Sequence, residues 1–114
     1  MYNRLYLKIL FLTSFTMADV LNVPDDYSTI QSAIEAADNG DSVFVSPGFY
    51  TETIDFEGKS IIVSSLYLME DDSLLIGSTI IDAQEDGSVA TFSSGEDSGS
   101  VLQGFTLQNG TGND

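Results

Sequence analysis

The side chains that could carry out chemistry in this chain are almost all carboxylates. The sequence has 18 Asp and Glu residues among 114, against three Lys and Arg, and contains neither Cys nor His. Without an imidazole or a thiol, these residues cannot form a Ser-His-Asp relay, a thiolate nucleophile or an ordinary zinc site. Any reaction would depend on carboxylates, hydroxyls and amides.

Two acidic clusters offer the oxygen ligands that Ca²⁺ prefers. They are Glu70-Asp71-Asp72 and the group formed by Asp82, Glu85 and Asp86. Ca²⁺ takes about six to eight oxygen ligands, and neither cluster follows the D-x-D-x-D-G loop pattern. We interpret both as solvated acidic loops. The sequence therefore assigns no catalytic, cofactor-binding or metal residue, and Ca²⁺ is the one cofactor that we consider for testing.

Aromatic and acidic side chains suggest a carbohydrate ligand, but a simpler interpretation is available for each. Phe49, Tyr50 and Tyr67 could stack on sugar rings through their apolar faces. Packing near a turn is the interpretation we favour. Glu35 and Asp38 are expected on the solvent face of a helix. Glycosidase chemistry needs two acids held at a fixed separation across a groove, which the sequence cannot establish.

The charge balance excludes nucleic acid as an expected partner. The formal net charge is −15, and two of the three cations, Arg4 and Lys8, lie in the first ten residues. Binding of phosphate backbones needs clustered Lys and Arg. We interpret the acidity as a means of solubility in a salty exterior.

The first 18 residues resemble a secretory leader. They have a basic opening, an apolar run from Ile9 to Phe15, and Thr16-Met17-Ala18 before the acidic part begins. This pattern predicts a signal peptide over 1–18, cleaved after Ala18, and a domain over 19–114. The apolar run is shorter than the roughly 20 residues that cross a bilayer. A buried N-terminal strand or helix is the alternative. We expect a secreted or cell-surface protein without a transmembrane segment.

One helix is expected in the mature chain, over Ser28 to Asn39. Its apolar residues Ile30, Ala33, Ile34 and Ala37 follow the i, i+3, i+4, i+7 pattern. Ser28 and Gln31 form an S-x-x-Q pattern, which predicts a capping box. Gly40 is expected to end the helix. The narrow apolar stripe suits a helix that lies as a lid on another element.

The remaining chain is patterned as short strands separated by Gly, Ser and Asp turns. Val43 and Val45 precede Ile61 and Val63 by 18 residues, and Ile80 follows Ile61 by 19. Strands that recur about every 20 residues without intervening helices indicate a solenoid of parallel coils. An antiparallel sandwich is the alternative. The expected strands are Val20–Val23, Ser42–Ser46, Thr51–Phe56, Ile61–Val63, Leu74–Ile76, Val89–Phe92 and Val101–Leu107.

The segment Asp25–Ser65, DDYSTIQSAIEAADNGDSVFVSPGFYTETIDFEGKSIIVSS, resembles the opening of right-handed parallel β-helix proteins of the pectin lyase-like superfamily. That family has a TIQ-AI-A helix, a GD-V-V-PG-Y-E segment and a GK-I-V-S strand. The run Thr79–Gly110, with TIIDA, VATFSSGED and VLQGFTLQNG, is similar to the same family. The resemblance implies an all-β, right-handed parallel β-helix (solenoid) with a short N-terminal capping α-helix. It also implies an inward Asn109 in a stacked amide ladder.

Two branches of that family fit. The stretch from Phe92 to Thr106 is most similar to secreted or cell-surface repeat proteins, which implies an exported scaffold for binding or display, non-catalytic within these residues. A weaker likeness is to the N-terminus of pectinesterase. It implies, as the alternative, the N-terminal part of a polysaccharide-active enzyme, an esterase or lyase with catalytic residues beyond this chain. A negative chain suits a negative polymer poorly.

The final residues, Gly110 to Asp114, show no capping element. Because solenoids need a cap at both ends, we expect the chain to be an N-terminal fragment, with further coils of the same chain after residue 114. The expected partners are an extracellular polysaccharide or a surface ligand.

Overall fold

The computed structural model describes residues 17–67 and 74–112, which form three parallel sheets and two helices. The first sheet has the order β1-β2-β5-β8, the second β3-β6-β9 and the third β4-β7. The strands are β1 (Val20–Val23), β2 (Ser42–Val45), β3 (Gly48–Thr51), β4 (Ile54–Asp55), β5 (Ile62–Ser65), β6 (Thr79–Asp82), β7 (Ala90–Thr91), β8 (Val101–Gln103) and β9 (Thr106–Gln108); the helices are α2 (Ile30–Ala36) and α4 (Leu74–Ser78).

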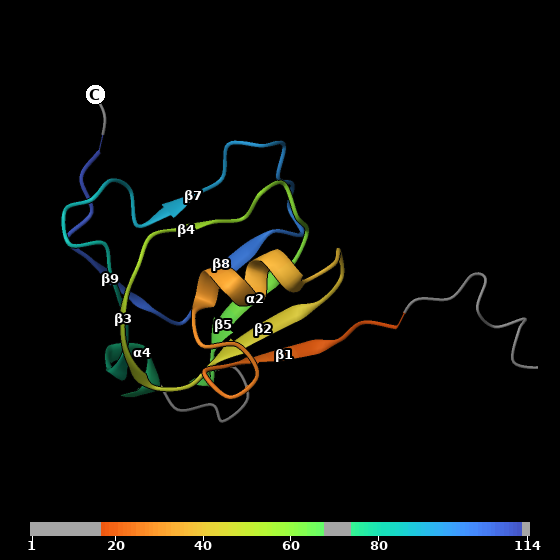
Figure 1. Cartoon of the computed structure of the whole chain (residues 1–114), viewed down its shortest axis with the longest axis horizontal. Coiled ribbons are helices and arrows are strands. Elements are labelled where there is room, and N and C mark those ends of the chain that lie inside the picture. The colour runs from red at the N-terminus through yellow and green to blue at the C-terminus, as the bar shows by residue number, and fades with distance from the viewer. Residues whose placement is uncertain (1–16, 68–73, 113–114) are drawn as a thin grey trace, which may run out of the picture.

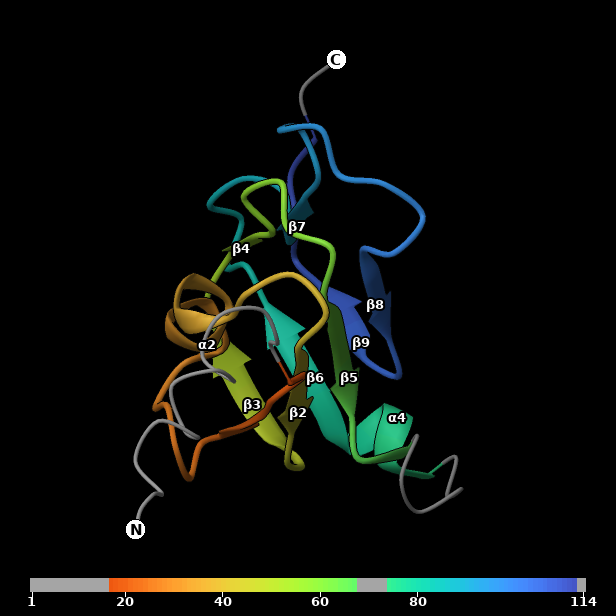
Figure 2. The same ribbon diagram turned by 90° about the vertical axis from the view of Figure 1, so that its right-hand side faces the viewer.

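The three sheets face a shared interior, and α2 lies at one end of it. Figure 1 shows α2 in front of the strands, with β1, β2, β5 and β8 on one side, β3 on another and β4 with β7 above. The view turned by 90° places α2 at the side of β1 and β3, and places β7, β8 and β9 away from it (Figure 2). The last strand of each sheet therefore lies on the side opposite to α2.

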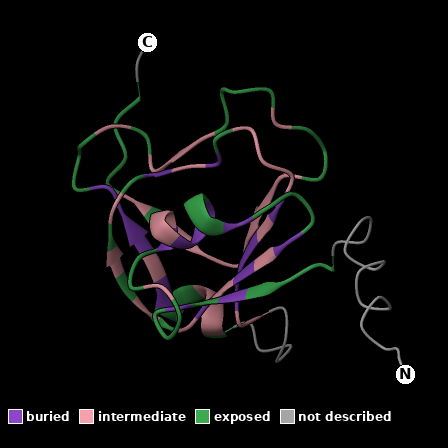
Figure 3. Cartoon of the chain, turned by 45° about the vertical axis from the view of Figure 1, so that its right-hand side comes forward, coloured by how far each residue is buried: buried purple, intermediate pink, exposed green. Residues whose placement is uncertain are grey.

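The core is formed by inward residues of the sheets and by the apolar stripe of α2. Figure 3 shows the buried residues between the strands and the helix. Val43, Val63 and Ile81 are fully buried, and the Phe56 ring, also buried, stacks on Phe92 with ring centroids 4.3 Å apart. Alternation along the strands produces this pattern, since successive side chains point to opposite faces. β1, for example, alternates between exposed and buried residues.

Helix α2 forms where the i, i+3, i+4, i+7 pattern predicts it, but over a shorter range. Ile30, Ala33, Ile34 and Ala37 are all buried. The capping box uses Thr29 and not Ser28: the Thr29 hydroxyl accepts from the backbone N–H of Ser32, and the Ser32 hydroxyl accepts from the N–H of Thr29. The predicted S-x-x-Q box is wrong, because Gln31 is engaged elsewhere.

The predicted fold class, an all-β right-handed parallel β-helix (solenoid) with one capping helix, is contradicted. The described residues are 14% helical and 33% in strands, a mixed α/β content in short parallel sheets, and no sheet forms a solenoid or a closed structure. Helix α4 occupies the stretch where we predicted the strand Leu74–Ile76. A short apolar run does not distinguish a strand from a helical turn by periodicity.

The regular repeat inferred from the spacing is also wrong. In the first sheet Leu21 pairs with Val43, Val43 with Val63 and Val63 with Leu102, which are unequal steps of 22, 20 and 39 residues. Ile80, expected to follow Ile61 in one stack, pairs with Phe49 in the second sheet. The apparent period of about 20 residues therefore combined strands that belong to different sheets.

Two predicted strands are divided in the structure. The range Thr51–Phe56 contains the end of β3 and the separate strand β4, with Glu52 and Thr53 between them. The range Val101–Leu107 divides into β8 and β9 at Gly104, which has a φ of +84°. A Cβ at Gly104 would collide with the Ser65 hydroxyl oxygen and lie 2.9 Å from the Tyr67 ring. A glycine is thus required where the chain turns from one sheet to the next.

Most of the predicted signal peptide, residues 1–16, lies outside the described residues. In the part of the chain that the structure describes, no helix is long and apolar enough to cross a membrane.

Candidate functional site

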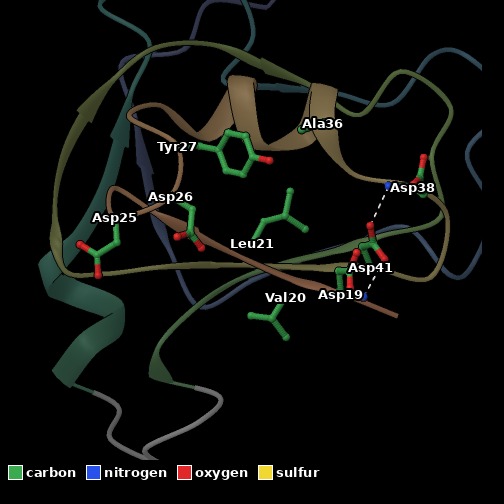
Figure 4. A pocket seen from close by; sticks show the side chains of 9 residues that line it. All are labelled: Asp19, Val20, Leu21, Asp25, Asp26, Tyr27, Ala36, Asp38 and Asp41. Carbon is green, nitrogen blue, oxygen red and sulfur yellow. Dashed lines mark hydrogen bonds between the residues drawn. The ribbon is translucent and has the colours of Figure 1, made fainter. Parts of the chain in front are cut away.

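The main hollow of the described surface is an acidic groove beside β1. It has a volume of about 630 Å³ and lies between β1, the connection to α2, and the segment that leads from α2 to β2. Figure 4 shows its side chains around an open space. Its lining, which we call the acidic groove, consists of Asp19, Val20, Leu21, Asp25, Asp26, Tyr27, Ala36, Asp38 and Asp41.

Asp41 organises one end of this groove. Its side chain is 5% exposed and accepts two backbone N–H groups, from Asp19 at 2.9 Å and from Asp38 at 2.8 Å (Figure 4). Parallel pairing of β1 with β2 brings residue 19 close to residue 41. The carboxylate of Asp41 therefore joins the start of β1 to the segment after α2, and both of its oxygens are occupied.

The other end is a tight turn after β1. The N–H groups of Asp26 and Tyr27 both donate to the carbonyl of Asn22, at 2.8 and 3.1 Å. Asp26 Oδ2 accepts from the backbone N–H and the side-chain amide of Asn22, at 3.0 and 3.1 Å. This turn places Asp25, Asp26 and the half-buried Tyr27 ring on the groove.

The groove can accept hydrogen bonds, and it cannot neutralise an anion. Five of its nine lining residues are aspartates, and none is Lys or Arg. Carboxylates accept hydrogen bonds from hydroxyl and ammonium groups, and a tyrosine ring gives an apolar face on which a sugar can pack. The arrangement suits a neutral or cationic ligand, and it repels a polyanion.

Glu52, in the predicted family segment, fixes the beginning of α2. Its two carboxylate oxygens accept the backbone N–H groups of Ile30, at 3.0 Å, and Gln31, at 2.9 Å. These are two of the N–H groups that a helix leaves without internal partners. A negative charge at this end also interacts favourably with the helix dipole.

Lys59 fixes the opposite end of α2. Its ammonium group donates to the carbonyl oxygens of Ile34, at 2.8 Å, and Glu35, at 2.9 Å. A cation is favourable at a helix C-terminus, where carbonyl groups lack internal partners. Within residues 17–67 and 74–112, Lys59 is the one Lys or Arg side chain. Its charge is therefore directed at the helix.

Gln31 joins α2 to the third sheet. Its side-chain oxygen accepts from the N–H of Asp55 at 2.7 Å, and its side-chain NH₂ donates to the carbonyl of Asp55 at 3.1 Å. The amide thereby pairs with the backbone of β4 as a neighbouring strand would. The three polar residues of the family-like segments, Gln31, Glu52 and Lys59, all hold α2 in place.

The acids considered as Ca²⁺ ligands do not gather into a metal site in the described residues. Glu70, Asp71 and Asp72 lie outside the described range. Asp82 is buried, whereas Glu85 and Asp86 are exposed in the turn that follows β6. Across residues 17–67 and 74–112, no group of three or more His, Cys, Asp or Glu side chains could hold a metal ion. Ca²⁺ binding stays a prediction.

Asp82 is instead the centre of a hydrogen-bonded corner. Its Oδ2 accepts from the side-chain amides of Gln108 and Asn109, each at 2.9 Å, and its Oδ1 accepts from the N–H of Gln84 at 2.7 Å. The bonds from Gln108 and Gln84 outweigh burial and hold the pKa of Asp82 below its ordinary value. Asn109 is exposed and bonded to a carboxylate, so the predicted inward amide ladder is wrong at this residue.

Two further carboxylates bind the backbone in the loop between β7 and β8. Burial alone would raise the pKa of Glu96, but the N–H groups of Gly58 and Ser94 donate to it and lower that pKa. The pKa of Asp97 is lowered chiefly by the hydroxyl of Ser60, which donates at 2.7 Å. Both side chains tie the loop to the turn before β5.

The remaining candidates are dispersed. Phe49 is 57% exposed on β3, whereas the Tyr50 hydroxyl donates to the carbonyl of Ser46 at 2.7 Å and its ring packs against the core. Burial of Tyr50, with smaller effects from nearby acids, raises the pKa of its hydroxyl. Glu35 is exposed on α2, as expected, and Asp38 is also exposed but lies after the helix, in the acidic groove.

The acidic groove itself was not predicted. Asp19 and Asp41 are 22 positions apart and meet only through pairing of β1 with β2. The one available sequence signal was the density of aspartates between residues 19 and 41. That signal gives no register, so it could not have identified the lining.

Comparison with protein-family models, with curated proteins and with solved structures gave no match.

Proposed function

We propose that this chain is an exported binding or display scaffold, secreted or at the cell surface, and that residues 1–114 perform no catalysis. The observation that carries the proposal is the use made of Gln31, Glu52 and Lys59. Each of these polar side chains holds α2 against its neighbours through hydrogen bonds of 2.7–3.2 Å. Groups that are tied in this way position the helix, and they are not available to a substrate.

The acidic groove is the ligand site in this proposal. Its ligand would be an extracellular glycan or other surface molecule that presents hydroxyl or ammonium donors, with Tyr27 as the apolar contact. Asp25 is exposed and accepts no side-chain hydrogen bond within the described residues, so its carboxylate can reorient toward a ligand. Asp41, by contrast, is occupied by backbone N–H groups and serves to shape the groove.

The experiment is a binding titration followed by NMR, with three oligosaccharides that differ in charge. We expect a cationic chitosan oligomer to shift the signals of Leu21 and Tyr27 more strongly than a neutral cello-oligomer, and a polygalacturonate oligomer to cause no shift. The Asp25→Asn variant should weaken chitosan binding. Glu35→Asn, an acid-to-amide change on the exposed surface of α2, is the matched control and should leave it unchanged.

Preferential binding of polygalacturonate, or equal effects of both variants, would contradict the groove as the site. The alternative, that this is the N-terminal part of a pectinesterase or polysaccharide lyase, predicts the affinity for the anionic oligomer that the five aspartates disfavour.

A further inference from the structure

The three sheets all end on one side of the molecule. β8, β9 and β7 are the last strands of their sheets, and they lie away from α2 (Figure 2). In a parallel ladder, alternate residues direct their N–H and C=O groups to the neighbour on one side. The outer sides of β8 and β9 therefore present backbone donors and acceptors that no other strand of residues 17–67 and 74–112 pairs with. We call this surface, formed by β8 and β9, the open edge.

Inward apolar side chains at the open edge are covered on one side only. Leu107 pairs in register with Ile81, which is fully buried, yet Leu107 itself is 46% exposed. Leu102 stands beside the fully buried Val63 and is only partly buried, and Phe105 is likewise only partly buried. These residues thus continue the core without a neighbour on their outer side.

The opposite end of the interior differs. There α2 contacts β1, β2 and β4, and Ile30, Ala33 and Ile34 are fully buried. The helix supplies apolar cover at that end. Among the described residues, no comparable element covers the open edge.

The charges around the open edge favour a basic occupant. The turns next to β7, β8 and β9 carry Glu85, Asp86, Glu96 and Asp97. Lys59, the cation of the described part, is bonded to the carbonyls of α2 and does not offset them. A second copy of this chain would bring a further net charge of −15 and be repelled.

We propose that the open edge binds an extended, basic segment of a partner protein by strand addition. The segment runs parallel to β8 and β9, pairs with their outer backbone groups, and places its apolar side chains on Leu102, Phe105 and Leu107, with its basic side chains toward the acidic turns. Strand addition of this kind takes affinity from main-chain hydrogen bonds and specificity from alternate side chains. The inference rests on the proposed binding role and names the class of partner.

The test uses synthetic peptides of about ten residues. The first alternates valine and lysine, the second is the same peptide with alternate backbone nitrogens methylated, and the third alternates valine and glutamate. We expect the first to bind in calorimetry and to protect the amide of Leu102 from hydrogen exchange. Methylation should weaken binding by about tenfold or more, because it removes main-chain hydrogen bonds. The valine-glutamate peptide should not bind.

A pair of variants locates the site. Leu107→Lys and Val20→Lys each add one positive charge at a half-exposed apolar residue, the first on β9 and the second on β1, at the far edge. Leu107→Lys should weaken the valine-lysine peptide by about tenfold, and Val20→Lys should weaken it far less. If Leu107→Lys does not fold, Leu107→Ser tests the same contact without the charge.

Equal affinity for the methylated and unmethylated peptides would mean simple charge attraction and would overturn the proposal. A concentration-dependent dimer in sedimentation, abolished by Leu107→Lys, would assign the edge to a second copy and would overturn it as well. Because these readouts are at Leu102 and Leu107, a failure here is distinct from a failure of ligand binding at Leu21 and Tyr27.

Discussion

The carboxylate of Glu52 is predicted to contribute a large share of the stability of this small fold. It is half-buried and accepts the first two N–H groups of α2 at 3.0 and 2.9 Å. A hydrogen bond to a charged group contributes about 1.5–3 kcal/mol, and partial exposure lets water replace part of this. We therefore expect Glu52→Ala to lower the free energy of unfolding by about 2 kcal/mol.

The assay is thermal unfolding followed by circular dichroism, with urea unfolding as a second measure. For a domain of this size, about 2 kcal/mol corresponds to a fall in Tm of roughly 10 °C. Glu52→Gln keeps one acceptor oxygen and should lose about half as much. Glu35→Gln removes one charge from the exposed surface of α2 and should change Tm by no more than about 2 °C. Equal Tm values for Glu52→Ala and Glu35→Gln would refute the reasoning.

Three further predictions concern other parts of the frame. Lys59→Met keeps the length of the side chain but removes two bonds to helix carbonyls, so urea unfolding should show a loss of about 1–2 kcal/mol. Gly104→Ala places a Cβ against Ser65 at a φ of +84°, and should lower Tm by at least about 5 °C; an unchanged Tm would show that the corner can relax. The pKa of Asp82 is lower in the folded protein than its ordinary 3.8, so its contribution is present above about pH 4 and is lost as the pH falls through the folded pKa. Asp82→Asn should therefore be less stable than the wild type at neutral pH and show a shallower loss of stability in acid; parallel curves would count against this role.

Local patterns predicted the elements of this fold better than their assembly. β1 and β2 were expected almost to the residue, because their alternation and the flanking turns are local signals. The α2 stripe was found for the same reason. The strand register was not, since Val43 pairs 20 residues ahead with Val63, and not 18 ahead with Ile61 as the spacing suggested.

The helix at residues 74–78 shows a second limit of local patterns. Leu74, Leu75 and Ile76 are apolar, and we expected a strand, yet the run forms α4 against β6 and β9. The hydroxyl of Thr106, on β9, donates to the carbonyl of Ile76 at 2.9 Å. That contact joins residues 30 positions apart, and no window of a few residues could reveal it.

The candidate site was less predictable than the fold. Glu52 and Lys59 were visible as parts of family-like segments, but their contacts with α2 depend on side chains reaching across 21 to 25 positions. The acidic groove depends on the pairing of β1 with β2 and on the turn at Asn22. Composition indicated an acidic surface, and only the three-dimensional arrangement shows where it is hollow.

The central claim is that these residues bind and do not catalyse. It is tested most directly by incubating the purified protein with methyl-esterified pectin and with polygalacturonate, with and without Ca²⁺, and measuring released methanol and the absorbance of unsaturated products. The account predicts no rate above a heat-denatured control. A rate that falls in Glu52→Gln at a temperature where that variant remains folded would show that Glu52 acts on a substrate, and would contradict the account.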